Sequence, residues 1–501
     1  MVTNVKSATI HGIEACIVTV ETDIGDGLPS FDMVGLLSSE VREARERVRT
    51  ALKNSGFTIP PKRITINLAP ADLRKMGTYF DLPIAISILT CIGVIPEENV
   101  AEAMFIGELG LDGHTVRVNG VLPIVLKAME QGMKRCFIPE DNLSECTLAS
   151  GIEIIPVCNL NELVLGLVSN EFQQFDGIRE IKSGVGDNFE YDFADVLGQV
   201  VAKRAAEITA AGMHNMLMIG TPGAGKTMIA KCMPSIMPAM SEEEKLEVAG
   251  IYSVAGMLEE GKPLLRPFRS PHHTASLTSL TGGGLNPKPG EFTLAHRGVL
   301  FFDELPEFQS RTIELLRQPL EDRCISISRM GGKYVFPSDF IFLGASNPCK
   351  CGYYPDRTKC KCSEIEVKKY MGRISGPIMD RIDLCVHVLP VRYVELNSRE
   401  KSESSGEIRK RVEAAVEIQK ERYRDLNINY NSQLDGRQIK DYCPLGKKET
   451  ALMKDIFENM NMSVRSYHRV IKVSRTIADL CGDKEISTRH IYEAMAYRIK
   501  N

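Results

Sequence analysis

A glycine-rich stretch at residues 220–227 constrains the fold more than any other feature of this chain. It fits the pattern G-x-x-x-x-G-K-[ST] and consists of Gly220, Thr221, Pro222, Gly223, Ala224, Gly225, Lys226 and Thr227. Residues 215–219 before it, apolar after Asn215, are typical of a buried strand, and residues 227–231 after it are typical of the start of a helix. A phosphate-binding loop requires this strand, loop and helix in this order. The pattern therefore predicts an α/β sheet built around the loop.

The residue types in this stretch indicate a nucleotide as ligand. Glycines let backbone N–H groups turn towards phosphate oxygens with no side chain in the way. Lys226 supplies a positive charge for the β- and γ-phosphates, and Thr227 supplies a hydroxyl for Mg²⁺. A glycine-rich turn before an ordinary helix is the alternative, but strand, loop and helix all agree with the motif. We predict ATP and Mg²⁺ as cofactors, bound by residues 220–227.

Two adjacent acids follow a second apolar run, residues 299–302. Asp303 is predicted to help Thr227 hold Mg²⁺, and Glu304 to orient or deprotonate the attacking water. Alone, such a run is often only a strand that meets solvent. Downstream of a phosphate-binding loop it favours ATP hydrolysis.

The chain divides into three predicted parts, which make it an α/β multidomain protein. Residues 1–168 read as an α+β domain, with a helix from Ser38 to Asn54 that places Val41, Ala44, Val48 and Leu52 on one face. Residues 169–190 are polar and predicted to be a linker. Residues 191–395 alternate strands with helices, including a helix that opens with a capping box at Ser241, and residues 396–501 read as a helical C-terminal lid.

Bulk properties narrow the location and the partners. The 501 residues carry a formal net charge of −4, so DNA contact would need a local basic lining. The N-terminus opens directly into a strand-like pattern, so we expect no signal peptide. The longest apolar run, residues 82–95, is too short to cross a bilayer. We expect a cytoplasmic protein without a membrane partner.

Four of the fourteen cysteines crowd into one short window, as Cys349, Cys351, Cys360 and Cys362. Four thiolates can close a tetrahedral zinc site, and the turn-rich spacer lets the two pairs meet. Unligated reduced thiols and a redox disulfide are the alternatives. We predict a structural Zn²⁺ site, because four protein ligands leave no open position for catalysis.

Further motifs resemble those of AAA+ ATPases. The strand that ends in Asn347 resembles a sensor 1 strand, with Asn347 near the γ-phosphate. Residues 373–384 resemble the arginine-finger region of the magnesium-chelatase and MCM helicase branch, with Arg381 preferred as the finger and Arg373 as the alternative. Residues 463–469 resemble a lid-helix sensor 2, with Arg465 preferred over Arg469. Residues 195–199, with Val196 and Gly198, resemble the segment that lines the adenine pocket.

Together with residues 266–274, these motifs resemble the YifB/ComM family of magnesium-chelatase-like AAA+ ATPases over essentially the whole chain. The resemblance implies an ATP-driven hexameric ring, since a finger that acts in trans completes the site of a neighbour. It also implies a DNA helicase that promotes branch migration in recombination or natural transformation, on single-stranded or branched DNA. An ATP-driven remodeller of a protein or metal-chelatase partner is the alternative.

Two further segments receive predictions from resemblance. Residues 277–292 look like a pore insert, in which Lys288 would touch a phosphate backbone; the alternative is a surface loop. Residues 74–85 and 106–110 resemble the ribosomal protein S5 domain 2-like fold shared with Lon protease. The Lon-type serine and lysine positions fall at Tyr79 and near Pro123, which cannot perform that chemistry. An ATP-dependent protease is therefore disfavoured.

Overall fold

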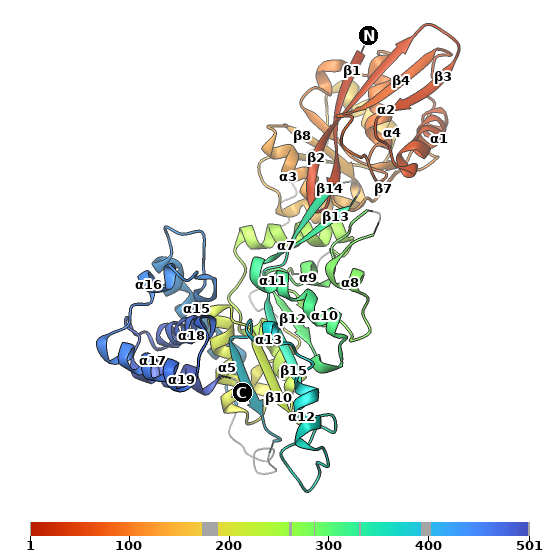
Figure 1. The fold of residues 1–501 in the computed structure, drawn as a ribbon. Coiled ribbons are helices and arrows are strands. Elements are labelled where there is room, and N and C mark those ends of the chain that lie inside the picture. The colour runs from red at the N-terminus through yellow and green to blue at the C-terminus, as the bar shows by residue number, and fades with distance from the viewer. Residues whose placement is uncertain are drawn as a thin grey trace.

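The computed structural model describes residues 2–172, 189–259, 263–284, 286–329, 332–391 and 402–498. Three parts follow one another along the chain: an N-terminal α/β part, a central part with a parallel sheet, and a helical C-terminal part (Figure 1). The mixed α/β class and the helical C-terminal region are as predicted. Most of the predicted linker, residues 173–188, lies outside the described residues.

The N-terminal part is built on a seven-stranded mixed sheet in the order β3-β4-β2-β1-β5-β8-β9. Its strands are β1 (Val2–His11), β2 (Glu14–Gly25), β3 (Ser30–Val34), β4 (Arg63–Ala69), β5 (Ala103–Phe105), β8 (Arg135–Pro139) and β9 (Glu153–Val157); β6 (Glu108–Leu109) pairs with β7 (Thr115–Val116). Helices α1 (Ser39–Asn54), α2 (Asp81–Cys91) and α4 (Leu160–Ser169) contribute to one apolar core, and α3 (Val121–Glu130) to another. Helix α1 buries the predicted face, Val41, Ala44, Val48 and Leu52.

The central part holds a five-stranded, all-parallel sheet in the order β11-β12-β15-β10-β16. The strands are β10 (Met216–Gly220), β11 (Phe268–Arg269), β12 (Val299–Phe302), β15 (Ile341–Ser346) and β16 (Leu384–Val388). Every residue of β10, β12 and β15 is buried, which explains their continuous apolar sequences. The helices are α5 (Val200–Gly212), α6 (Lys226–Ile236), α7 (Glu242–Ala255), α8 (Leu277–Thr281), α9 (Glu291–Leu294), α10 (Ser310–Leu315), α11 (Arg317–Asp322), α12 (Glu364–Met371) and α13 (Gly376–Met379). Helix α7 begins after Ser241 with the predicted capping box.

An antiparallel hairpin that the sequence analysis missed connects the central part to the N-terminal part. Its strands, β13 (Cys324–Arg329) and β14 (Gly332–Pro337), reach from the central part towards the N-terminal sheet (Figure 1). Tyr334 of β14 stacks on His11, with ring centroids 4.2 Å apart. Helix α7 forms a second contact, where the Ser253 hydroxyl donates to Glu145. The hairpin and α7 therefore both hold the N-terminal part.

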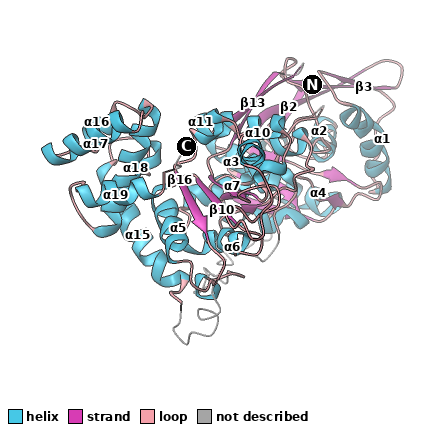
Figure 2. Ribbon diagram, turned by 60° about the horizontal axis from the view of Figure 1, so that its bottom comes forward, coloured by secondary structure: helices cyan, strands magenta, loops and turns pink. Residues whose placement is uncertain are grey.

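The C-terminal part, which we call the lid, is a group of helices on the side of the central part away from the N-terminal part (Figure 2). It comprises α15 (Ser405–Arg422), α16 (Gln438–Tyr442), α17 (Lys447–Asn459), α18 (Val464–Cys481) and α19 (Thr488–Ala496). Polar contacts tie the lid to α5 and the residues that follow it: Gln419 donates to the Ala211 carbonyl at 2.9 Å, and His214 and Thr476 are hydrogen-bonded at 2.8 Å. Among the described helices, none is both long and apolar enough to span a bilayer.

Candidate nucleotide-binding site

The phosphate-binding loop lies between β10 and α6, at the carboxyl end of the parallel sheet. Gly223 and Gly225 have φ values of 74° and 93°, in the left-handed region that side chains disfavour. Gly220 is required for another reason: a Cβ there would lie 2.3 Å from the Val388 carbonyl oxygen of β16. The glycines thus serve both the turn of the loop and the close approach of two strands.

Lys226 and Asn347 meet at this end of the sheet. The Lys226 ammonium donates to the carbonyl oxygens of Gly220 at 2.6 Å and Thr221 at 3.0 Å, and to Asn347 Oδ1 at 3.1 Å. Asn347 can reach it because β15, which ends one residue earlier, is the parallel neighbour of β10. Burial lowers the pKa of Lys226, and the charges of Asp303 and Glu304 oppose that shift.

The acids after β12 reach the same place. Thr227 Oγ1 donates to Asp303 Oδ2 at 2.8 Å, so the hydroxyl and the carboxylate predicted to hold Mg²⁺ are adjacent. Both are oxygen ligands of the kind that Mg²⁺ uses alongside water and substrate phosphates. Glu304 is exposed and has a left-handed φ of 51°, a strained conformation that is common at functional sites. The donor set fits the predicted Mg²⁺.

These side chains line one cleft of about 350 Å³. Its lining consists of Pro222, Gly223, Ala224, Gly225, Lys226, Thr227, Asp303, Glu304, Ser346 and Asn347. The segment predicted to line an adenine pocket adjoins it, because Gln199 donates to the Ala224 carbonyl at 3.2 Å. In that segment Val196 is buried and Gly198 has a positive φ of 63°. The predicted phosphate, metal and water groups therefore converge, although their roles stay predictions.

The predicted arginine finger, Arg381, and the predicted sensor 2 residue, Arg465, lie elsewhere, at the amino end of the sheet. The Arg381 carbonyl accepts a hydrogen bond from Asn215, the residue before β10. The Arg381 guanidinium pairs with Glu321, and Arg465 of the lid lies 3.6 Å from the other oxygen of the same carboxylate. Both arginine side chains therefore contact the Glu321 carboxylate, at the opposite end of β10 from the phosphate-binding loop.

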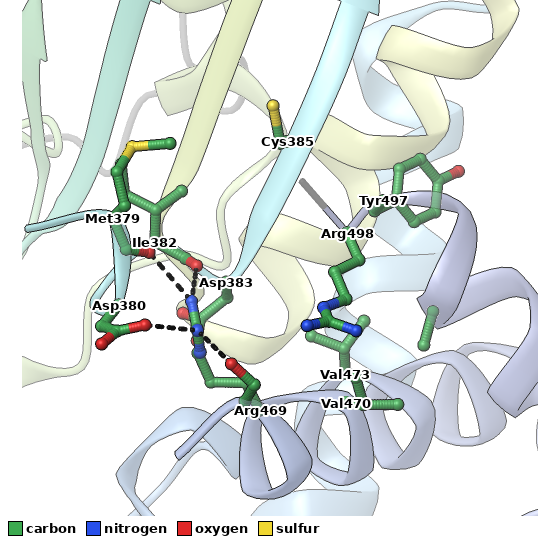
Figure 3. A pocket seen from close by; sticks show the side chains of 12 residues that line it. Met379, Asp380, Ile382, Asp383, Cys385, Arg469, Val470, Val473, Tyr497 and Arg498 are labelled. Carbon is green, nitrogen blue, oxygen red and sulfur yellow. Dashed lines mark hydrogen bonds and ion pairs between the residues drawn. The ribbon is translucent and has the colours of Figure 1, made fainter. Parts of the chain in front are cut away.

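The two alternative arginines have different surroundings. Arg469 donates to the carbonyls of Met379 and Ile382, to Asp380 and to Ser466, so it joins the lid to the central part (Figure 3). Its side chain is 19% exposed, against 63% for Arg465. Arg373 donates to the Pro306 carbonyl at 3.1 Å and pairs with Glu307, close in sequence to Glu304 of its own chain. These contacts favour a structural role for Arg469.

Lys288 is exposed in a short loop closed by reciprocal backbone hydrogen bonds between Gly283 and Lys288. The tip of the β13–β14 hairpin adjoins this loop, because a Cβ on Gly283 would lie 3.5 Å from the Arg329 guanidinium. Arg329 and Lys333 at this tip are also exposed. The sequence did carry a signal for the hairpin: Gly331 and Gly332 separate two runs of alternating apolar and polar residues.

The four clustered cysteines face one another. The sulfur of Cys349 lies 3.3 Å from that of Cys351 and 3.7 Å from that of Cys360, and the latter two are 3.5 Å apart. With Cys362, all four sulfurs lie within 4.8 Å of one another. The geometry is compatible with the predicted zinc ion.

The two positions predicted to correspond to the Lon-type serine and lysine are occupied by Tyr79 and, nearby, Pro123. Burial raises the pKa of Tyr79 to about 12, so its phenol stays protonated at neutral pH. Pro123 lies in α3 and faces α7, where a Cβ on Gly250 would contact its ring at 3.6 Å. Pro123 therefore belongs to the junction between the N-terminal and central parts.

Comparisons with known proteins find relatives over nearly the whole chain. Three family descriptions match: "Magnesium chelatase, subunit ChlI" over residues 192–396, "Subunit ChlI of Mg-chelatase" over 20–142, and "Magnesium chelatase, subunit ChlI C-terminal" over 402–498. Competence protein ComM of Haemophilus influenzae is 40% identical over 99% of this chain and 97% of its own length. Uncharacterized protein YifB of Escherichia coli is 40% identical over 97% of this chain and 95% of its own. DNA repair protein RadA of Bacillus subtilis is 43% identical over 82 residues, which are 16% of this chain and 18% of that protein. The chain thus belongs to the ComM/YifB family of magnesium-chelatase-like AAA+ ATPases.

Proposed function

We propose that this protein is an ATP-hydrolysing ring motor, hexameric and cytoplasmic, that acts on DNA as a helicase or branch-migration factor in recombination or natural transformation. The observation that carries the proposal is the split arrangement of its predicted catalytic groups. Lys226, Thr227, Asp303 and Asn347 are joined by hydrogen bonds in one cleft, whereas Arg381 and Arg465 share Glu321 at the far end of the sheet.

Each side chain in the cleft has a role that its position supports. Lys226 and the loop N–H groups bind the β- and γ-phosphates, and Thr227 and Asp303 hold Mg²⁺, which neutralises charge on the phosphates when bound. Glu304 orients the attacking water or accepts its proton, and Asn347 orients the groups beside the γ-phosphate. The Lys226–Asn347 hydrogen bond holds the ends of both side chains beside the phosphate-binding loop.

Arg381 and Arg465 would then act on a neighbouring subunit. Guanidinium groups at the opposite end of the sheet complete a site only when another copy presents its cleft to them, and a closed ring repeats that contact at every interface. Because both groups already lie on one carboxylate, a single neighbouring cleft can receive both. This supports a homo-oligomer in which hydrolysis depends on assembly.

DNA is the proposed cargo. Lys288, Arg329 and Lys333 form an exposed basic group on two adjoining loops, the local lining that a chain with a net charge of −4 requires. Two relatives support the choice through their names, a competence protein and a DNA repair protein. The matches to magnesium-chelatase subunits favour a second candidate, a remodeller of a protein or metal-chelatase partner. We also propose that the four cysteines hold a structural Zn²⁺.

Nucleic-acid dependence separates these two candidates. We expect single-stranded or branched DNA to stimulate ATP hydrolysis, and unfolded protein or porphyrin to have no effect. The wild-type protein should also move a DNA branch point, whereas Lys226→Ala and Glu304→Gln, checked for native folding, should not. Stimulation by a protein or porphyrin but not by DNA would reject the DNA motor in favour of the remodeller.

A further inference from the structure

We propose that the metal held by the four cysteines controls ATP hydrolysis, because the cysteine loop presses one glycine against the phosphate-binding loop. The loop spans residues 349–362, between β15 and α12, and begins two residues after Asn347. The inference rests on the proposed ATPase activity and assigns a regulator to that same site. Cys349 and Cys360 are buried, whereas Cys351 is exposed.

The positions of the sulfurs fit zinc. Four ligands at about 2.3 Å from a central Zn²⁺ lie about 3.8 Å from one another in a regular tetrahedron. The sulfur–sulfur distances of 3.3, 3.5 and 3.7 Å among Cys349, Cys351 and Cys360 are slightly shorter, and all exceed the bond length of a disulfide, about 2.05 Å. Cys349 also belongs to a tight turn in which the Gly352 N–H donates to its carbonyl at 2.9 Å. The loop is thus folded for four sulfurs around one centre.

Gly352 joins this cluster to the nucleotide site. It is buried, follows Cys351 directly and has a left-handed φ of 85°. A Cβ at this position would lie 2.6 Å from Pro222 Cδ and 2.8 Å from Pro222 Cγ, and 3.9 Å from Asn347 Cγ. Its backbone therefore packs directly on the ring of Pro222 and lies beside Asn347, two residues that line the cleft. No other residue type fits this contact without displacing one of the two loops.

The described hydrogen bonds of residues 353–359 stay within the loop itself: Thr358 donates to Asp356, and Arg357 donates to the Cys362 carbonyl. Between the two cysteine pairs, residues 353–359 form turns, and all but Tyr354 are exposed. Ordering an exposed segment of this kind costs backbone entropy, which four sulfur–metal bonds can offset. Without the ion, the contact between Gly352 and Pro222 loses its support. Asn347 then loses its fixed position on Lys226, and the cleft loses the geometry that hydrolysis needs.

Two sets of variants test the two halves of the proposal on the full-length protein. The first compares Cys351→Ser and Cys362→Ser with Cys16→Ser, which changes a half-buried cysteine in the N-terminal sheet. Zinc per chain is measured by mass spectrometry of the metal after purification without chelators, and basal ATPase by phosphate release. We expect one zinc in the wild type and in Cys16→Ser, and both zinc and ATPase lost in the other two, with unchanged circular dichroism.

The second set separates the contact from the metal. Gly352→Ala keeps all four ligands but places its methyl group against Pro222. Gly56→Ala is the matched control, because Gly56 has the same φ of 85° and nothing within 4 Å of its Cβ position. We expect Gly352→Ala to keep its zinc and to lose roughly 10- to 100-fold in kcat/KM for ATP, since misplacement of about 1 Å can cost that much. Gly56→Ala should match the wild type.

Each other outcome overturns a stated part. A wild-type protein without zinc rejects the metal site. Zinc-free cysteine variants with wild-type ATPase reject the control of hydrolysis, as does a fully active Gly352→Ala. A zinc-dependent ATPase that DNA does not stimulate would support this inference and reject the DNA motor, so the two proposals fail by different measurements.

Discussion

Replacing Arg381 by alanine tests whether the nucleotide site is shared between subunits. Its backbone is bonded to Asn215 at the start of β10, and the phosphate-binding loop begins at Gly220 at the end of that strand. Five residue steps of about 3.3 Å, from Asn215 to Gly220, put roughly 16 Å of chain between the two points. Arg381 therefore cannot serve its own cleft. Because a finger supplied in trans is worth about 10³–10⁵ in kcat, we expect Arg381→Ala to abolish measurable ATPase.

Mixing two inactive variants then reveals the trans arrangement. In an equal mixture of Arg381→Ala and Glu304→Gln chains, a site is whole when the first variant supplies the cleft and the second supplies the finger. Random assembly makes about one quarter of the sites whole, so we expect up to about a quarter of wild-type phosphate release at the same total concentration. Differently tagged chains confirm that mixed rings form.

Mixed rings that hydrolyse no more ATP than either parent would refute this reasoning. The same mixture with Arg373→Ala in place of Arg381→Ala serves as the control. Arg373 contacts the Pro306 carbonyl and Glu307 of its own chain, so it is expected to give a smaller loss and no recovery on mixing. If the mixture with Arg373→Ala recovered ATPase and the mixture with Arg381→Ala did not, Arg373 would be assigned as the finger.

Gly220→Ala should lower the free energy of unfolding by about 1–3 kcal/mol, measured by denaturant titration, because its methyl group would overlap the Val388 carbonyl. Arg469→Ala should cost about 2 kcal/mol in the same titration, through lost hydrogen bonds between the lid and the central part; an unchanged midpoint would contradict this. His296 and Arg297 lower the pKa of Glu247 to about 2, so these pairs add stability above pH 4.5 that is lost as the pH falls towards 2. The difference in Tm between wild type and Glu247→Gln should therefore shrink at pH 3. Lys288→Ala should weaken DNA stimulation of the ATPase and reduce the salt slope of DNA binding by about one, and full stimulation would exclude the pore contact.

The features that could be predicted from the sequence depend on residues close together in the chain. The phosphate-binding loop and the capping box at Ser241 are each formed by a few neighbouring residues, so the local sequence pattern is enough to predict their backbone structure. Asn347 lies 121 residues from Lys226, yet parallel strands end at a common edge, and a polar residue after an apolar run there was foreseeable.

The unpredicted features depend on where separate segments meet. Glu321 gathers Arg381 and Arg465 only because α11, the segment before β16 and the lid converge, and no periodicity encodes that meeting. The contact of Gly352 with Pro222 is equally invisible in the sequence, since a glycine after a cysteine reads as an ordinary turn. The β13–β14 hairpin was overlooked although its two glycines are a recognised turn signal.

The docking of that hairpin on the N-terminal part would matter mechanically in the proposed motor. A two-stranded ribbon alone bends easily and is marginally stable in water. Here one face of the ribbon, with buried Tyr334 and Phe336, leans on the turn between β1 and β2, and Tyr334 stacks on His11. A pull on the exposed tip at Arg329 or Lys333 is therefore resisted by a seven-stranded sheet as well as by the hairpin. In the proposed motor, the N-terminal part would stiffen the ribbon against force applied at its tip.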